Sequence, residues 1–257
     1  MKPTAAHDCS RPPAVILLGG RGTRIAAAYP DRPKALVPVI GRPFIEWQLD
    51  ALAALGIRRI VLAAGHMADR LADWLSASLP SRFKALDIAL AVEPAPLGTA
   101  GALLHALPVL PPGAAHVFVL NGDTLFPGLV PGLFDAILAR AGALPPDAAH
   151  LLVAPIDHPD RYGIVDFASD TGRVTAFREK APADSGYINA GAYLFPASLL
   201  RALPPATPEA PLSMENDLFP SLVAASRLYA HPIPPPLLDM GTPEGLEALA
   251  DYLAKEQ

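Results

Sequence analysis

The residues best suited to chemistry lie in a glycine-rich segment near the N-terminus. An apolar run ending at Leu18 is followed by the sequence GGRGTR, and Lys34 comes ten residues after Arg24. Glycines that follow a strand let backbone N–H groups approach an anion, and Gly20 and Gly22 can adopt the positive φ that such a turn needs. Arg24 can grip phosphate oxygens through its planar fork, whereas Lys34 is a mobile point charge. The segment therefore predicts a loop that binds a polyphosphate.

Spacing separates this loop from two other nucleotide-binding loops. Ile25 stands where a dinucleotide-binding fingerprint has its third glycine, and no helix-opening pattern follows. A P-loop would end in Gly-Lys-Ser/Thr, whereas here the lysine follows Pro30 and Pro33, which break any helix. Taken alone, the stretch is also compatible with a plain strand-to-loop turn that carries solvated arginines.

Composition favours a globular protein of the cytoplasm. The chain has 257 residues, 51% of them hydrophobic, so it can bury the core of one large α/β domain or of two small ones. The formal net charge of −5 argues against a general nucleic-acid-binding protein. Because Cys9 is the single cysteine, a disulfide framework and a cysteine-rich metal site are excluded, which suits a reducing compartment.

Neither a signal peptide nor a membrane span is expected. Residues 1–13 lack the apolar core of a signal peptide, and we expect them to form a flexible tail. Residues 94–122 contain no Asp, Glu, Lys or Arg, but their five prolines would break a spanning helix, and lipid offers no water to satisfy the freed backbone groups. Buried α/β segments explain this stretch better.

Strand and helix patterns alternate after the glycine-rich loop. This rhythm predicts an α/β fold with parallel strands, in which ligands bind at the carboxyl ends of the strands. The predicted strands are 14–18, 59–64, 86–92 and 116–120, and the predicted helices are 42–56, 67–79 and a helix capped by Thr99 that ends at residue 107.

Asp123 follows the predicted strand 116–120 in the sequence Asn121-Gly122-Asp123. Since the glycine-rich loop also follows a buried strand, we expect both to face the same crevice. Mg²⁺ commonly pairs one or two carboxylates with substrate phosphates, so an acidic residue beside a polyphosphate loop suggests a magnesium site. From these residues alone, a simple turn is equally compatible.

The second half of the chain has a different pattern, typical of antiparallel strands. A hairpin is predicted at Asp170-Thr171-Gly172, and the strand after it leads into Glu179 and Lys180, which could simply be exposed charges. Thr242 followed by Pro243 predicts the start of a final helix that ends near residue 254. Further predictions are strands near 151–156, 162–167, 173–177 and 189–195, a helix capped by Ser213 that ends at residue 222, and an edge strand within 228–238.

Five signatures in this order resemble the sugar-1-phosphate nucleotidylyltransferases. They are LLGGRGTR with RPKALVPVIGRP, EPAPLGTAGAL, VLNGDT, FREK with INAGAYLF, and LLDMGTPEG. The details YGIVDF and SMENDLFP are most similar to guanylyltransferases that act on D-glycero-α-D-manno-heptose 1-phosphate. The resemblance implies a three-layer Rossmann-like fold, with a mostly parallel central sheet and a smaller, more antiparallel sugar-binding part. The implied single domain covers 14–257, with a nucleotide-binding half (14–125) and a sugar-phosphate-binding half (126–257).

The resemblance also implies roles for individual residues. Arg24, Lys34, Asp123 and Lys180 would act in catalysis, and Asp123 and Asp239 would hold Mg²⁺. The nucleotide would contact Leu18, Gly19, Gly20, Gly22, Thr23, Arg24, Lys34, Glu93, Gly98, Thr99, Asn121, Gly122 and Asp123. The sugar phosphate would contact Gly163, Glu179, Lys180, Asn189 and Asp239. The chain departs from many relatives at Pro33-Lys34-Ala35, where they carry Pro-Lys-Pro, but the charges are retained.

The implied reaction transfers a nucleotidyl group from a nucleoside triphosphate, GTP in this subfamily, to the sugar 1-phosphate, giving pyrophosphate and a nucleotide sugar for surface polysaccharide synthesis. The enzyme would be cytoplasmic, would bind neither nucleic acid nor membrane, and could form a homodimer. One alternative is a uridylyl-, thymidylyl- or guanylyltransferase for another sugar 1-phosphate, such as that of mannose, glucose or N-acetylmuramic acid. A second is a non-catalytic subunit that senses nucleotide sugars, although such a subunit need not keep all the charged residues.

Overall fold

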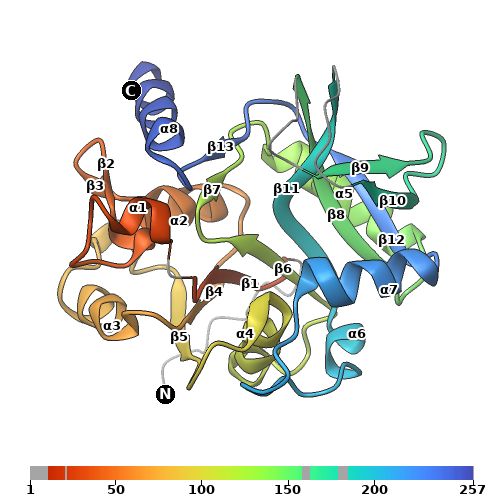
Figure 1. The fold of residues 1–257 in the computed structure, drawn as a ribbon, viewed down its shortest axis with the longest axis horizontal. Coiled ribbons are helices and arrows are strands. Elements are labelled where there is room, and N and C mark those ends of the chain that lie inside the picture. Colours follow the sequence, from red (N-terminus) through yellow and green to blue (C-terminus); the bar gives the residue numbers. More distant parts are fainter. Residues whose placement is uncertain (1–10, 21, 158–162, 179–184, 257) are drawn as a thin grey trace, which may run out of the picture.

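The computed structural model describes residues 11–20, 22–157, 163–178 and 185–256, and it has the predicted α/β fold built on one nine-stranded sheet (Figure 1). The N-terminal half contains β1 (Ala14–Leu18), α1 (Thr23–Ala26), η1 (Lys34–Leu36), β2 (Pro38–Val39), β3 (Arg42–Pro43), α2 (Phe44–Ala54), β4 (Arg59–Ala64), α3 (Ala68–Ala77), η2 (Ser81–Phe83), β5 (Asp87–Val92), α4 (Gly98–Ala106), η3 (Leu107–Val109), β6 (His116–Asn121) and β7 (Thr124–Leu125). The C-terminal half contains α5 (Pro131–Ala143), β8 (Ala149–Asp157), β9 (Ile164–Phe167), β10 (Val174–Arg178), β11 (Ser185–Pro196), α6 (Ala197–Arg201), η4 (Met214–Leu218), α7 (Phe219–Ala224), β12 (Leu228–Pro232), β13 (Leu238–Asp239) and α8 (Pro243–Lys255).

The four strands that the N-terminal half contributes to the nine-stranded sheet are parallel, as predicted. β1 lies between β4 and β6, and β5 pairs with the outer side of β4. These strands are short apolar runs because helices cover both faces of this part of the sheet. Alternate residues of β1 show this directly: Ile16 packs in one hydrophobic cluster with Leu49 of α2, and Val15 packs in a second cluster with Leu103 of α4. The result is the expected three-layer arrangement.

The C-terminal half continues the same sheet with mostly antiparallel pairing. The long strand β11 pairs antiparallel with β6, β8 and β9, and Figure 1 shows it running from the centre of the sheet to its outer end. The hairpin predicted at Asp170-Thr171-Gly172 connects β9 and β10, and Gly172 supplies the left-handed turn residue with φ 71°. β12 pairs parallel with β8 and forms an edge, as the prolines that follow it predict.

Helix ends agree with the sequence at two caps and differ at a third. Thr242 caps α8, accepting a hydrogen bond from Gly245 N (3.1 Å), and Ser213 Oγ accepts one from Asn216 N (3.1 Å) at the start of η4. Thr99, however, is not an N-cap: α4 begins one residue earlier at Gly98. The cap comes instead from Leu212 O, which accepts hydrogen bonds from the N–H groups of Ala100 and Gly101. The chain returns to this helix end from more than a hundred residues away, which local sequence does not reveal.

Three further α-helices were not predicted: α1, α5 and the short α6. α1 begins directly after the glycine-rich loop, contrary to the expectation that no helix opens there, but it has only four residues. α5 begins at Pro131 and packs Phe134 and Ile137 into the core. Its proline at the first helical position, followed by apolar residues at helical spacing, was a readable start signal.

Residues 11–13 belong to the folded structure. Arg11 forms an ion pair with Asp135, and Pro13 O accepts a hydrogen bond from Phe118 N (2.9 Å). At the other end of the chain, α8 lies over β13 and the β2–β3 hairpin (Figure 1). None of the helices in the described ranges is both long and apolar enough to cross a membrane.

Two buried histidines face each other across β8 and β12. His150 Nδ1 lies 3.0 Å from His231 Nε2, and the two residues are only 1% and 4% exposed. Burial, together with the positive charges of His231 and Arg140, lowers the pKa of His150 to about 3, and burial together with the charge of Arg140 lowers the pKa of His231 to about 4. His116 also acts on His150 in the same direction. The pair is therefore neutral in the folded protein at pH values where exposed histidines are charged.

This pair makes the fold sensitive to mild acid. Below the ordinary histidine pKa of about 6.5, both histidines are protonated in the unfolded chain but stay neutral in the folded protein. The free energy of unfolding therefore falls as pH drops from about 6.5 towards 4. We expect a loss on the order of 2 kcal/mol per histidine between pH 7.5 and pH 5, measured from urea unfolding midpoints. The double variant His150→Leu/His231→Leu should show a clearly flatter dependence, and the exposed-site control His66→Gln should not. Parallel pH curves for all three proteins would contradict the assignment.

Candidate active site

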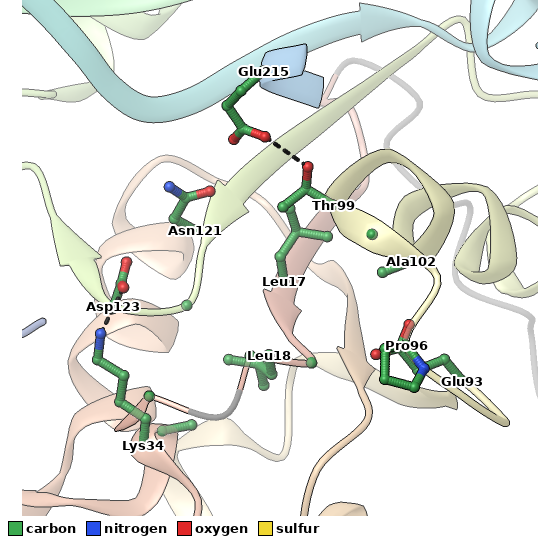
Figure 2. Close-up of a pocket in the computed structure, with 16 residues that line it drawn as sticks. Leu17, Leu18, Lys34, Glu93, Pro96, Thr99, Ala102, Asn121, Asp123 and Glu215 are labelled. Carbon is green, nitrogen blue, oxygen red and sulfur yellow. Dashed lines mark hydrogen bonds and ion pairs between the residues drawn. The ribbon is translucent and has the colours of Figure 1, made fainter. Parts of the chain in front are cut away.

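A cavity of about 390 Å³ opens at the carboxyl ends of β1 and β6, where the fold predicts a ligand site (Figure 2). Its walls come from the glycine-rich loop, the β6–β7 turn, the start of α4 and the start of η4. The lining residues are Leu17, Leu18, Gly19, Gly20, Gly22, Lys34, Ala35, Glu93, Pro96, Gly98, Thr99, Ala102, Asn121, Gly122, Asp123 and Glu215.

Lys34 and Asp123 meet on one side of this cavity. Lys34 Nζ lies 2.6 Å from Asp123 Oδ2, and Figure 2 shows the pair beside the glycine-rich loop. Both side chains are partly buried, so their charges are less screened by solvent than those of a surface pair. Gly22 lies against the stem of Lys34, because a Cβ on Gly22 would be 3.2 Å from Lys34 Cδ. The predicted cation and the predicted carboxylate are thus in direct contact.

The two glycines singled out in the loop behave differently. Gly22 has φ 54°, the left-handed conformation that glycine adopts without strain, and α1 begins at the next residue. Gly20 does not have positive φ, which corrects the prediction for that residue. It is exposed, and a Cβ there would meet nothing within 4 Å, so Gly20 leaves the mouth of the cavity open.

The turn that carries Asp123 packs tightly on the end of β1. Gly122 N donates to Leu17 O (3.0 Å), and a Cβ on Gly122 would lie 2.2 Å from Leu18 Cδ2. Only glycine fits there. Asn121, the last residue of β6, directs its side chain towards the cavity (Figure 2) and lies against Gly191, where a Cβ would be 2.7 Å from Asn121 Nδ2.

Glu93 lies on the other side of the cavity from Lys34 (Figure 2). Its Oε2 accepts a hydrogen bond from Leu97 N (3.2 Å). Its Oε1 lies between two glycines, since a Cβ on either Gly19 or Gly65 would be 2.4 Å from that atom. The glycine-rich loop therefore packs on the carboxylate of Glu93 at this end and on the aliphatic stem of Lys34 at the other.

The cavity wall where α4 meets η4 contains a carboxylate of η4 that sequence reasoning missed. Glu215 Oε2 accepts hydrogen bonds from Thr99 Oγ1 (2.9 Å) and Ser213 Oγ (3.0 Å), and Thr99 Oγ1 accepts one from Met214 N (2.8 Å). Thr99 is thus a link between α4 and η4. Gly98 is required at this contact, because a Cβ there would lie 2.4 Å from Leu212 O.

Asp239 lies next to the turn but outside the cavity lining. It pairs with Thr124 in the small β7–β13 sheet, and Met240 N donates to Asp123 O (2.9 Å). Burial raises the pKa of the Asp239 carboxyl, and the negative charge of Asp123 raises it further, while Gly241 N, Lys34 and Arg24 oppose the shift. Two carboxylates that repel each other in this way fit a divalent cation, whose charge would relieve the repulsion. In the described part of the chain no third His, Cys, Asp or Glu completes a metal cluster, so substrate oxygens would have to supply further ligands.

Asn189 reaches the site only through a neighbour. Its Nδ2 donates to the Tyr193 hydroxyl (3.0 Å) and its Oδ1 accepts from Gly191 N (2.8 Å). Tyr193 is fully buried, which raises its pKa, and its hydroxyl also hydrogen-bonds the Asn121 side chain. The three side chains connect the β11 bulge to the cavity wall.

The other predicted site residues lie further away or outside the described ranges. Arg24 is exposed on α1 and does not line the cavity, although its charge acts on Asp239. Thr23 is the first residue of α1, and Gly163 precedes β9, where a Cβ would be 3.2 Å from Arg178 O. Glu179 and Lys180 lie outside the described residues. The cavity adds residues that the sequence did not single out: Leu17, Ala35, Pro96, Ala102 and Glu215.

The chain belongs to the nucleotidyl transferase family, whose model matches residues 13–256. It is 33% identical over 249 residues to mannose-1-phosphate guanylyltransferase 1 of Arabidopsis thaliana, covering 95% of this chain and 66% of that protein. It is 32% identical over 250 residues to the mannose-1-phosphate guanylyltransferase catalytic subunit beta of Danio rerio, covering 93% of this chain and 64% of that protein. The chain therefore spans slightly less than two thirds of these relatives.

Solved structures share the fold over nearly the whole chain. HddC from Yersinia pseudotuberculosis superposes with a TM-score of 0.78 at 25% identity, covering 95% of this chain and 100% of that one. A putative glucose-1-phosphate thymidylyltransferase from Bacillus anthracis, solved with sucrose, superposes with a TM-score of 0.76 at 22% identity, covering 96% of each chain. These likenesses confirm the expected Rossmann-like nucleotide-diphospho-sugar transferase fold.

Proposed function

We propose that this protein transfers a guanylyl group from GTP to a sugar 1-phosphate, with D-glycero-α-D-manno-heptose 1-phosphate as the preferred acceptor. The products would be pyrophosphate and a GDP-sugar for surface polysaccharide synthesis in the cytoplasm. The observation that carries the proposal is the Lys34–Asp123 pair, which lies beside the glycine-rich loop in a cavity large enough for a nucleotide. Membership of the nucleotidyl transferase family and the guanylyltransferase relatives support the same class of reaction.

The chemistry needs charge compensation more than proton transfer. A phosphate oxygen of the sugar 1-phosphate attacks the α-phosphorus in line, the bond to the bridging oxygen breaks, and pyrophosphate leaves with the electron pair. Because the nucleophile is already ionised, no strong general base is required. The barrier comes from bringing two anions together and from the charge that builds on the leaving group.

The chain supplies groups for each of these tasks. Lys34 would leave Asp123 to bind phosphate oxygens, backbone N–H groups of the loop would hold the polyphosphate, and Arg24 would add positive charge at its outer edge. Lys180, by resemblance, would bind the phosphate of the acceptor. Asp123 and Asp239 are the residues that would hold Mg²⁺, which when bound neutralises phosphate charge.

Glu93 supports guanine as the base. Lys34 and Glu93 lie on opposite sides of the cavity, so a nucleotide with its phosphates at Lys34 can direct its uncharged base towards Glu93. A carboxylate only accepts hydrogen bonds. The N1–H and exocyclic N2–H groups of guanine are adjacent donors that match it, whereas the N3–H of uracil or thymine is flanked by two carbonyl oxygens that a carboxylate repels.

Glu93→Gln should therefore weaken base selection. The amide replaces one acceptor by a donor, so we expect kcat/KM for GTP to fall by about tenfold or more, while the ratio of UTP or dTTP to GTP rises. Initial rates of pyrophosphate release with each nucleotide give the ratio. Glu209→Gln, which makes the same change on an exposed loop, is the matched control. An unaltered base preference would remove Glu93 from base recognition.

The acceptor assignment rests on the sequence details YGIVDF and SMENDLFP and on the relatives. Mannose and D-glycero-α-D-manno-heptose share the manno ring configuration, and HddC is among the structural neighbours. A sugar of this configuration is therefore proposed, with the heptose ahead of mannose.

A substrate panel tests the proposal. The purified protein is incubated with Mg²⁺ and with GTP, UTP, dTTP or ATP, each combined with heptose, mannose or glucose 1-phosphate, and pyrophosphate release is measured. The highest kcat/KM is expected for GTP with the heptose. A preference for UTP or dTTP would contradict the proposed specificity for GTP, and a preference for glucose 1-phosphate would contradict the proposed sugar specificity. If no pair of substrates releases pyrophosphate, the result would favour the alternative of a non-catalytic subunit that senses nucleotide sugars.

A further inference from the structure

Gln48 is a buried polar residue that contacts the active-site turn without lining the cavity. It lies on α2, on which Ile45 and Leu49 pack into the core, and it is only 1% exposed. Buried glutamine side chains require hydrogen-bond partners, so the partners of this amide indicate what it does there.

Both N–H groups of the Gln48 side-chain amide donate hydrogen bonds to the turn that carries Asp123. Nε2 donates to Asn121 O (2.9 Å) and to Thr124 O (3.0 Å). Asn121 is the last residue of β6 and Thr124 is the first of β7, so the two carbonyls bracket Gly122 and Asp123. One planar amide therefore fixes the spacing between the two ends of the turn.

The orientation of the amide is set by these partners. Carbonyl oxygens only accept hydrogen bonds, so Nε2 rather than Oε1 must face them. Gln48 Oε1 is then left buried with no hydrogen-bond partner in the described structure. Leaving a buried acceptor unpaired costs about 1–3 kcal/mol, so this glutamine is a poor choice for stability alone.

Further hydrogen bonds hold the turn between β6 and β7 and the Asp123 side chain that contacts Lys34. Gly122 N donates to Leu17 O (3.0 Å), Met240 N donates to Asp123 O (2.9 Å), and Thr124 Oγ1 donates to Asp123 Oδ1 (3.1 Å). Asp123 Oδ2 is the atom that contacts Lys34. A shift of the turn would therefore move Asp123 and with it the resting position of Lys34.

We propose that Gln48 is a positioning residue for nucleotidyl transfer, in which its amide clamps the β6–β7 turn through two carbonyls and thereby fixes the Asp123 carboxylate opposite Lys34. The part that concerns turnover rests on the proposed function. The part that concerns the position of the turn does not depend on the proposed function and can be measured separately.

The test uses Gln48→Met, which keeps the length of the side chain and removes both donors. We expect kcat with GTP and mannose 1-phosphate to fall roughly tenfold or more, because displacements of about 1 Å carry penalties of this size, while KM for GTP changes by less than about threefold. Gln48→Glu, which places an acceptor against the two carbonyls, should lose at least as much. Leu52→Ala, a core truncation on the same helix, should lower the melting temperature but leave kcat within about twofold at temperatures where it is folded.

Two measurements distinguish a role of Gln48 in positioning Asp123 from a general loss of protein stability. In an Asp123→Asn background, Gln48→Met should lower kcat by less than about twofold, because the residue through which it acts has already been disabled. In amide hydrogen exchange, the segment 117–126 should exchange faster in Gln48→Met than in the wild type and in Leu52→Ala. Wild-type kcat in Gln48→Met, multiplicative losses in the double variant, or unchanged exchange in 117–126 would overturn the proposal. A wild-type protein without turnover would refute the proposed function but leave the exchange result decisive for Gln48.

Discussion

Lys34→Ala is expected to lower kcat for the proposed nucleotidyl transfer by about a hundredfold or more, equivalent to about 2.7 kcal/mol of transition-state stabilisation. Among the described residues, Lys34 is the cation that lines the cavity, 2.6 Å from Asp123 and against Gly22 of the glycine-rich loop. Its removal leaves the charge that develops on pyrophosphate without a partner and leaves Asp123 and Asp239 uncompensated. Steady-state pyrophosphate release with GTP and mannose 1-phosphate measures the loss.

The control for Lys34→Ala is Lys84→Ala, which removes an exposed lysine outside the cavity. It should leave kcat unchanged. Because the lost interaction strengthens in the transition state, kcat of Lys34→Ala should fall more than the affinity for GTP. Near-normal pyrophosphate release by Lys34→Ala would contradict the assignment.

Asp123→Asn is expected to have an effect of similar size. The asparagine keeps the shape of the side chain and an oxygen that can accept from Thr124 Oγ1, so the change isolates the charge. Without the carboxylate, Lys34 loses its partner and the proposed Mg²⁺ site loses one of its two protein ligands. We expect kcat to fall by roughly a hundredfold and the Mg²⁺ concentration needed for half-maximal activity to rise.

Asp73→Asn on the exposed face of α3 is the matched control for this variant. The double variant Lys34→Ala/Asp123→Asn should lose less than the product of the two single losses, because the two groups are in contact. Full activity in Asp123→Asn, or fully multiplicative losses, would show that Asp123 does not act with Lys34.

The sequence was sufficient where structure is local. The strand that ends at Leu18, the strand 59–64 and the caps at Ser213 and Thr242 could be predicted because apolar runs and capping residues act within a few positions. The sequence also predicted that the glycine-rich loop and Asp123 face the same crevice, because ligands bind at the carboxyl ends of parallel strands. This prediction did not depend on closeness in the sequence, since Lys34 and Asp123 are 89 positions apart.

The features that were missed depend on distant parts of the chain. Thr99 looked like a cap, but the carbonyl of Leu212 takes that role and turns Thr99 into the partner of Glu215, 116 positions away. Glu215 therefore had no local signal. Gln48 occurs in an ordinary amphipathic helix, and only the fold shows that its amide faces Asn121 and Thr124.

The continuity of the sheet has a mechanical consequence. β11 hydrogen-bonds to β6 along residues 192–196, to β8 at residues 185–189 and 193–194, and to β9 at residue 188, so one strand joins the parallel strands of the N-terminal half to the antiparallel strands of the C-terminal half. A hinge rotation of one half against the other would have to break this ladder, which is costly for buried backbone groups. We therefore expect the proposed substrates to be accommodated by the loops at the carboxyl edge of the sheet rather than by rotation of one half of the sheet against the other.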